Sequence, residues 1–324
     1  MVRAITAVVL GFLISGCYFN LDAGSFGRVS SMDEVLVSGS GDGPKIAMIE
    51  IAGVISEASP TGTLGMQRPS MVARFREALT LASDDDDVEG LLLRIRSPGG
   101  TVTASETLNH LIRRFKDETG RPVVAYLEGL ATSGGYYTAV ASDEVVAHPA
   151  AITGSIGVIM AGVNVSGLME RLGVADQTFT SGAFKDSGSP LREMRPDERE
   201  YLQEVIDELH AQFRAAVDTG RPGLDAEAIA SMADGRIYTA DRALGLGLID
   251  SLGHMEDAVQ ALEKRAEISE ASVVMYHRPG EYRENLYSRG AATPVHVDVD
   301  VFSFDRPQLA PGFYYLWTPG LSRD

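Results

Sequence analysis

The chain has 324 residues, of which 44% are hydrophobic and 23% are charged. This length and composition suit a globular protein with a large core and argue against a disordered chain. The formal net charge of -17 argues against a nucleic acid partner, because phosphate binding needs clustered Lys and Arg side chains.

The first 16 residues have the pattern of an export signal. Arg3 supplies a positive charge, and the uncharged apolar stretch Ala4–Ile14 follows it. This stretch is about half as long as the roughly twenty residues that cross a membrane. It therefore predicts a signal peptide over residues 1–16 that is removed from the mature protein.

The signal ends in Ile14-Ser15-Gly16-Cys17, which resembles a bacterial lipobox. The resemblance implies that Cys17 becomes a lipid-modified N-terminus, which would hold the protein on the exported side of a membrane in the bacterial cell envelope. Cys17 is the only cysteine, so an intramolecular disulfide is excluded. The alternative is an ordinary signal peptide followed by an incidental cysteine.

Residues 17–44 are polar and glycine-rich and predict a flexible tether. From residue 45 to residue 275, apolar strands alternate with amphipathic helices, which predicts parallel strand pairing and an α/β fold. The expected strands are 46–51, 90–95, 123–127, 144–147, 156–160 and 177–180, and the first helices are 70–82, 105–116 and 135–141.

A long helix opens at Arg195-Pro196, with acidic residues in its first turn. Its apolar stripe predicts core packing and consists of Leu202, Val205, Ile206, Leu209, Phe213, Ala216 and Val217. Three further helices are expected over 225–233, 240–246 and 255–265.

Residues 276–324 form a C-terminal extension. Val295–Val301 alternates strictly between apolar and polar residues, which is typical of a half-exposed strand. The aromatic cluster Phe313–Trp317 follows near the end of the chain. This extension could pack on the domain, on a neighbouring subunit or against lipid, and we favour packing within the protein assembly.

Ser133 lies where the strand over 123–127 gives way to a helix, with Gly134 directly after it. Backbone N–H groups at such a turn can face a developing negative charge, and glycine lets a substrate approach closely. A second glycine turn, Pro98-Gly99-Gly100, also follows a buried strand. Each turn could donate one N–H group to an oxyanion hole.

A serine hydroxyl needs a neighbouring base, and a lysine amine can serve when its surroundings favour the neutral form. Lys185 lies in Ser181–Gly188, which is only mildly apolar. The sequence therefore does not itself show the burial that such a lysine needs.

Five segments together resemble the successive motifs of signal peptide peptidase A, also called protease IV, over roughly residues 45–275. They are Arg96–Gly100, Ala131–Tyr137, Thr153–Val158, the Lys185 segment and Gly235–Thr239. The resemblance implies an α/β Clp-protease/crotonase-like spiral of repeated β-β-α units. It also implies a serine endopeptidase that acts on hydrophobic peptides such as cleaved signal peptides, without a cofactor.

Carried over by position, Ser133 is the nucleophile and Lys185 the general base. Gly100 and Gly134 supply the oxyanion hole, and Ser155 orients the lysine amine. The resemblance further implies a homo-oligomeric ring in which the dyad is shared between protomers. Two departures do not touch this chemistry: Thr132 stands where the family has a smaller residue, and Ala240 where glycine is common.

Other interpretations remain open. A histidine base is the rival to Lys185, with His148 and His110 as the candidates. A crotonase-like acyl-CoA enzyme would share the glycine turns, and a non-catalytic scaffold lipoprotein would share the fold. The acidic run Asp84–Asp87 lacks the spaced ligands of a calcium loop, and the scattered histidines do not predict a metal site.

Overall fold

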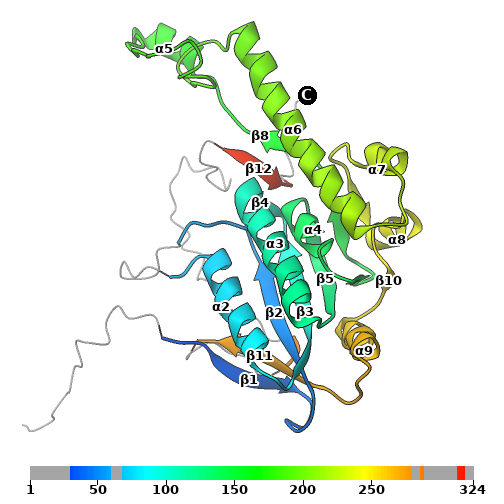
Figure 1. Cartoon of the computed structure of the whole chain (residues 1–324). Coiled ribbons are helices and arrows are strands. Elements are labelled where there is room, and N and C mark those ends of the chain that lie inside the picture. The colour runs from blue at the N-terminus through cyan, green and yellow to red at the C-terminus, as the bar shows by residue number, and fades with distance from the viewer. Residues whose placement is uncertain (1–29, 60–67, 279–284, 288–311, 318–324) are drawn as a thin grey trace, which may run out of the picture.

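A computed structural model describes residues 30–59, 68–278, 285–287 and 312–317 of the chain (Figure 1). Cys17 and the signal peptide, like the strand expected over Val295–Val301, lie outside these ranges. None of the helices in the described ranges is long and apolar enough to cross a membrane.

A mixed sheet forms the centre of the molecule, in the order β1-β11-β2-β3-β5-β6-β10. Its middle strands are parallel: β2 (Lys45–Ala52), β3 (Val88–Ser97), β5 (Val123–Thr132) and β6 (Glu144–Ala147). Strands covered on both faces need apolar side chains pointing both ways. Leu91, Leu92 and Leu93 of β3 meet this need, since all three are fully buried and Leu92 belongs to a different core cluster from its neighbours.

Helices cover both faces of the sheet. On one face, α2 (Met71–Asp84), α3 (Val102–Thr119) and α4 (Gly134–Ala139) bury apolar residues in the larger cluster (Figure 1). On the other, α9 (Met255–Ala266) packs Met255, Ala258 and Leu262 against the second cluster. The expected α/β class is confirmed.

The chain repeats a unit of strand, short second strand and helix. After β3, the short strand β4 (Gly99–Thr101) leads into α3. In β5, residues 123–127 pair in the central sheet, and residues 130–132 pair with β7 (Ile152–Gly154) before α4 begins. This recurrence is the expected spiral of β-β-α units, and it brings the ends of β3 and β5 together.

Residues 33–44 correct the prediction of a flexible tether over 17–44. Asp33–Ser38 form β1, which pairs antiparallel with β11 (Ser272–His277), and β11 itself lies parallel to β2. The Gly41 N–H also donates a hydrogen bond to Ser272 Oγ at 3.0 Å. The exposed edge of β11 offers unpaired backbone groups, and this part of the chain satisfies them.

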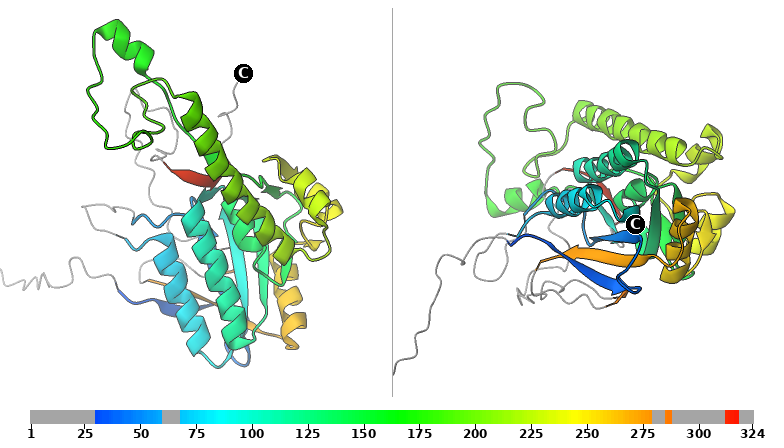
Figure 2. Two further views of the ribbon diagram at one scale, coloured as in Figure 1. Left: turned by 45° about the horizontal axis from the view of Figure 1, so that its top comes forward. Right: turned by 60° about the horizontal axis from the view of Figure 1, so that its bottom comes forward.

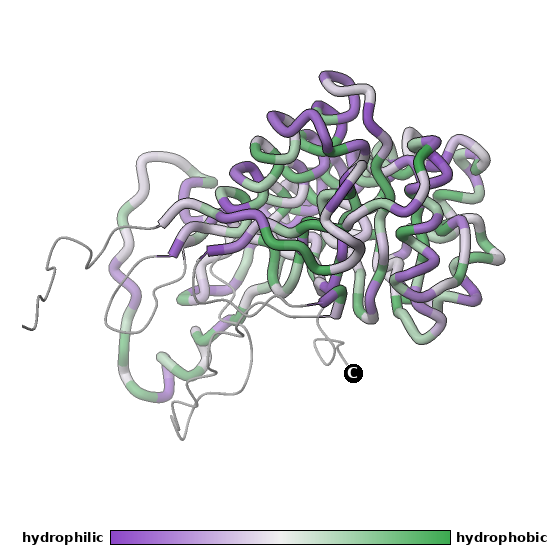
Figure 3. Tube along the Cα trace, turned by 90° about the horizontal axis from the view of Figure 1, so that it is seen from below, coloured by the Kyte–Doolittle hydropathy of each residue, from purple (hydrophilic) through white to green (hydrophobic). Residues whose placement is uncertain are grey.

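The segment between β8 (Ile159–Met160) and the long helix α6 (Pro196–Gly220) projects from the body (Figures 1 and 2). We call residues 161–195, which include α5 (Ser166–Leu172), the arm. Several stretches of the arm are hydrophobic (Figure 3). Val163, Leu172 and Phe179 are exposed there, Phe179 by 97%.

Two predictions fail around the arm. The strand expected over 177–180 is absent, because these residues are exposed and have no strand beside them with which to pair. The apolar stripe of α6 is buried at Phe213, Ala216 and Val217, but the residues nearer its N-terminus are only half-buried. That part of the helix extends past the body toward the arm (Figure 2).

The remaining elements close the fold around the end of β5. They are α7 (Ala226–Met232), β9 (Ile237–Thr239), α8 (Ala240–Gly245) and β10 (Ser251–Leu252). The C-terminal extension contributes β12 (Phe313–Leu316), which lies in a second, three-stranded sheet of the order β4-β12-β8.

The C-terminal end of α6 packs closely on α4, and this generates a test. A methyl group on Gly220 would collide with the Val140 carbonyl oxygen, whereas one on Gly223 would meet nothing within 4 Å. The clash should cost about 1–3 kcal/mol, more than the roughly 1 kcal/mol of helix propensity gained. Gly220→Ala should therefore lower the free energy of unfolding in denaturant titrations. Gly223→Ala is the matched control, and equal stability of the two variants would contradict the close contact.

Candidate active site

Ser133 occupies the junction of β5 and α4 in a strained backbone conformation. Its φ is 53° and its ψ is -118°, outside the regions that L-residues favour. The Ser133 N–H donates to the Gly154 carbonyl at 2.7 Å, and the Tyr137 N–H donates to the Ser133 carbonyl at 2.8 Å. These bonds hold the residue in place, and its side chain does not cap the helix that follows. Strain of this kind is concentrated at functional sites.

The two glycine turns lie against each other beside Ser133. A Cβ atom on Gly99 would lie 2.7 Å from the Gly134 nitrogen, and one on Gly134 would lie 3.1 Å from the Gly100 nitrogen. Gly99 itself has a φ of 101°, which favours glycine. The backbone amides of Gly100 and Gly134 therefore share one small region, as the sequence led us to expect.

Hydrogen bonds through Ser97 fix the first of these turns. The Ser97 hydroxyl donates to the Gly53 carbonyl at 2.6 Å and accepts from the Gly99 N–H at 3.0 Å. Ile55 bridges the far side, where its N–H donates to the Gly99 carbonyl and the Thr101 N–H donates to its carbonyl. A side chain on Gly100 would collide with Ile55, so the turn requires glycine here.

Two more of the predicted motifs meet at the same place. Strand β7 pairs with both β5 and β9, which joins the Thr153–Val158 motif to the Gly235–Thr239 motif. Ser155 is buried, has a φ of 53° and donates its N–H to the Arg236 carbonyl at 2.7 Å. Four of the five motifs thus surround the end of β5.

Lys185 is the exception, because it lies on the arm and its side chain is exposed. Among the described residues its ammonium group makes no hydrogen bond or ion pair. The structure of a single chain therefore does not bring Lys185 to Ser133 in the way that it brings the glycine turns together.

The turn that carries Lys185 is nonetheless well anchored to the start of α6. Arg192 Nε donates to Asp186 Oδ2 at 2.7 Å, and its two terminal nitrogens donate to the Glu198 carboxylate. Arg195 donates to the Ala183 carbonyl at 2.6 Å. The Arg192 hydrogen bonds hold the pKa values of Asp186 and of the buried Glu198 below their usual ranges. Both carboxylates therefore stay charged at neutral pH and fix the turn.

One strand beside the site was not predicted from the sequence. Strand β12 pairs antiparallel with β4 on one side and with β8 on the other. Its Tyr315 faces Gly100 in the register and is fully buried. The aromatic composition of Phe313–Trp317 was the available signal, but it did not reveal which strands would receive the segment.

His148 is engaged elsewhere, and His110 is exposed. The His148 ring packs edge-on against His254 at 5.1 Å, and its Nδ1 accepts a hydrogen bond from the Ala150 N–H. His110 is exposed on α3. Among the described residues, neither histidine makes a hydrogen bond with Ser133.

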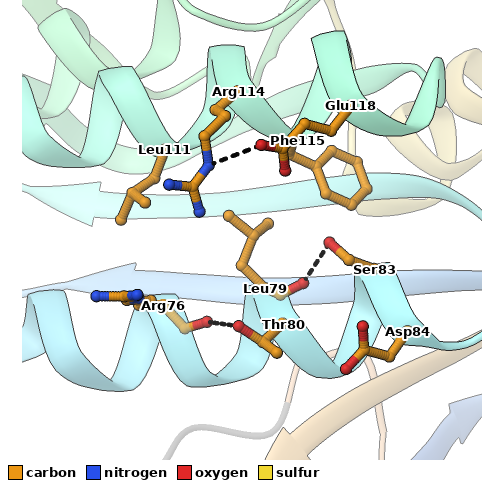
Figure 4. Close-up of a pocket in the computed structure, with 9 residues that line it drawn as sticks. All are labelled: Arg76, Leu79, Thr80, Ser83, Asp84, Leu111, Arg114, Phe115 and Glu118. Atoms are coloured by element: carbon orange, nitrogen blue, oxygen red, sulfur yellow. Dashed lines mark hydrogen bonds and ion pairs between the residues drawn. The ribbon is translucent and has the colours of Figure 1, made fainter.

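A surface hollow between α2 and α3 lies apart from the motifs (Figure 4). Its hydroxyl groups bond within their own helix, since Thr80 donates to the Arg76 carbonyl and Ser83 to that of Leu79. Arg114 pairs with Glu118 one turn further along α3. The two hydroxyl groups and the Arg114–Glu118 pair of this hollow are thus engaged within their own helices.

Comparison with known proteins agrees with the motif arrangement. The model of peptidase family S49 matches residues 115–269. A candidate signal peptide peptidase SppA of Enterococcus faecium is 34% identical over 251 residues, which are 78% of this chain and 72% of that protein. A candidate protease of Synechocystis is 38% identical over 216 residues, 67% of this chain and 72% of that protein. Protease 4 of Salmonella typhi is 29% identical over 76% of this chain, but only 38% of its own length is matched.

Proposed function

The chain belongs to peptidase family S49 and is a serine peptidase, and we propose that Ser133 and Lys185 form its catalytic dyad. The observation that carries this proposal is the strained Ser133 turn beside the amides of Gly100 and Gly134. A nucleophile next to two convergent N–H donors is the arrangement that acyl transfer requires.

In the proposed reaction, Ser133 Oγ attacks the scissile carbonyl carbon while the Lys185 amine accepts the hydroxyl proton. The N–H groups of Gly100 and Gly134 stabilise the oxyanion, and Lys185 returns the proton to the leaving amine. A water deprotonated by the same lysine then releases the acyl group. Ser155, at the β7 turn, would orient the amine.

We further propose that Lys185 serves Ser133 of a neighbouring protomer. Three features support this: Lys185 is exposed on the projecting arm, its turn is fixed by the Arg192 network, and exposed apolar residues accompany it. Covering the arm in a homo-oligomer would bury those residues and remove Lys185 from water. Desolvation favours the neutral amine, which is the form that acts as a base.

The proposed substrates are hydrophobic peptides such as cleaved signal peptides, met at a membrane surface in the bacterial cell envelope. This part of the proposal rests on the motif resemblance and on the lipobox-like sequence that ends at Cys17. A lipid on Cys17 would hold the peptidase close to the membrane from which such peptides are released.

Activity of single variants tests the dyad. Ser133→Ala and Lys185→Ala should each lower kcat on a peptide library by at least about a thousandfold, and the double variant should be scarcely worse because the two residues act as a unit. His148→Ala is the matched control and should keep its activity. Residual activity in Lys185→Ala that disappears when His148 is also changed would identify a histidine base instead.

Mixed oligomers test whether the dyad is shared between protomers. When Ser133→Ala and Lys185→Ala chains are co-expressed with different tags, some interfaces should join an intact serine to an intact lysine. Oligomers purified through both tags should recover part of the activity that each variant lacks alone. Doubly tagged oligomers without activity would place the dyad within one chain.

Lipid labelling tests the anchor. Cys17→Ser should abolish incorporation of radiolabelled palmitate and release the protein from the membrane fraction, because the variant has no thiol to modify. Ser15→Ala, which keeps the cysteine, is the control and should remain labelled. Labelled Cys17→Ser protein would rule out lipid attachment at this residue.

A further inference from the structure

We propose that Arg192 is a positioning residue for the general base, because its side chain fastens the turn that carries Lys185 to the first turn of α6. The inference rests on the proposed role of Lys185 and adds to it the residue that places the amine. Arg192 touches neither the substrate nor Ser133 in this scheme, and it acts only through Lys185.

The hydrogen bonds of the Arg192 side chain are the first line of support. Its Nε donates to Asp186 Oδ2 at 2.7 Å, and its Nη2 donates to the Asp186 carbonyl at 3.3 Å. Its Nη1 donates to Glu198 Oε2 at 2.9 Å and to the Glu193 carbonyl at 3.0 Å, and Nη2 also donates to Glu198 Oε1. All five N–H groups of the guanidinium are therefore engaged. A planar group with fixed donors holds two carboxylates at one relative position, which a single ammonium group does not do.

Glu198 is the fixed end of this connection. Its carboxylate is fully buried in the first turn of α6, where it also accepts a hydrogen bond from the Arg195 N–H at 3.0 Å. That bond is an ordinary helix-capping interaction, which does not need Arg192. A buried carboxylate is costly unless cations pair with it, and both Arg192 and Arg195 do so. The paired charges therefore join Arg192 firmly to the helix.

The residue on the other side of Lys185 is held to the same part of the helix. Arg195, directly before α6, lies over the Phe184 ring at 5.7 Å from its centroid. The same ring lies 5.4 Å from the ring of Tyr201 on α6. Arg195 also donates to the Ala183 carbonyl at 2.6 Å. Lys185 is thus flanked by two residues that contact the start of α6, while its own side chain is exposed.

These contacts are concentrated at the Lys185 turn. Among the described residues, those from 166 to 181 on the arm make no hydrogen bond or ion pair with α6. The Asp176 carboxylate, for example, bonds only to Thr178 two residues along the chain. The Arg192 network therefore secures the part of the arm that carries the lysine and not the arm as a whole.

Helix α6 makes this attachment rigid. Its other end is anchored in the body, where Phe213 is fully buried and packs edge-on against Tyr137 at 5.0 Å. The helix runs without a break from the body to the arm (Figure 2). Reacting groups need placement to within about 0.5 Å, and helices provide it better than loops do. Lys185 lies on a turn, and Arg192 ties that turn to a helix.

Loss of the connection has a definite kinetic signature. In the proposed reaction the Lys185 amine accepts a proton in the chemical step and does not bind the substrate. A displaced amine therefore lowers kcat and leaves KM unchanged. A displacement of only about 1 Å costs on the order of a hundredfold in rate.

Steady-state kinetics on a fluorogenic peptide test this directly. Arg192→Ala should lower kcat about a hundredfold and leave KM unchanged. Arg192→Lys should be nearly as slow, because an ammonium group does not bridge both carboxylates. Arg265→Ala is the control, since it removes an arginine of α9 that pairs with Glu144, and it should keep the parental kcat. Parental kcat in Arg192→Ala or in Arg192→Lys would overturn the proposal.

A second variant leaves the buried Glu198 paired. Arg192→Ala removes a partner of this carboxylate and can destabilise the arm, whereas Asp186→Ala cuts the link to the Lys185 turn and keeps the Arg192–Glu198 pair. Asp186→Ala should lower kcat about tenfold at unchanged KM, because the hydrogen bond to the carbonyl of residue 186 remains. Asp176→Ala, the same change elsewhere on the arm, is the matched control and should be fully active. Equal kcat values for the two aspartate variants would overturn the proposal.

Double variants show whether Arg192 acts through the lysine. The substrate is a p-nitrophenyl ester, whose leaving group needs no proton, so that Lys185→Ala should keep a measurable rate. In that background Arg192→Ala should make no further difference, because the residue through which it acts is already gone. A further loss as large as the loss in the parent would show that Arg192 acts independently of Lys185, and would overturn the proposal.

The dyad and the positioning role fail in different ways. Parental kcat on peptides in Lys185→Ala would reject the dyad itself. An inactive Lys185→Ala protein, together with parental kcat in Arg192→Ala and Asp186→Ala, would keep the dyad and reject only the positioning role.

Discussion

The site depends on one close approach of backbones. At the ends of β3 and β5 the chain at Gly99-Gly100 lies so near that at Ser133-Gly134 that no Cβ atom fits between them. This approach brings two backbone amide groups into one small region. Ser133 has a positive φ at this junction, and it is held there by the hydrogen bonds that it donates to Gly154 of β7 and accepts from Tyr137 of α4.

The same region joins the local chemistry to the rest of the fold. The parallel strands β3 and β5 end at one edge of the sheet, and each is followed by a short strand or turn before its helix. That extra unit gives β4 an edge with which the C-terminal strand β12 pairs. Phe213 of helix α6 packs on Tyr315 of β12, and the N-terminal end of the same helix adjoins the arm that carries Lys185. Helix α6 therefore links the strands beside Ser133 to the arm.

The sequence predicted the parts of this arrangement that follow from local patterns. The buried strand ahead of each glycine turn led us to expect amides of Gly100 and Gly134 beside Ser133, and the structure brings these two turns together. The strand predicted over 177–180 is absent, because a strand-like sequence forms a strand only where another strand lies beside it. Strand β1 was missed since its short alternation lies beside glycine-rich residues that indicate a loop.

Long-range pairing lay beyond sequence reasoning for a different reason. The partners of β12 are β4 and β8, which are far from it along the chain, and nothing local in Phe313–Trp317 specifies them. The surroundings of Lys185 are not specified locally either. In the described chain hydrogen bonds hold its turn to the start of α6, while its side chain is exposed.

The pairing of β1 with β11 also limits how far the sheet could lie from a lipid anchor at Cys17. Because the chain is fixed to the sheet from Asp33 onward, only the residues between Cys17 and Asp33 could connect the sheet to a lipid anchor. At roughly 3.5 Å per residue, the length of this connection is no more than about 55 Å even when it is fully extended. A lipid anchor at Cys17 would thus keep the β1 end of the sheet within about 55 Å of the bilayer surface.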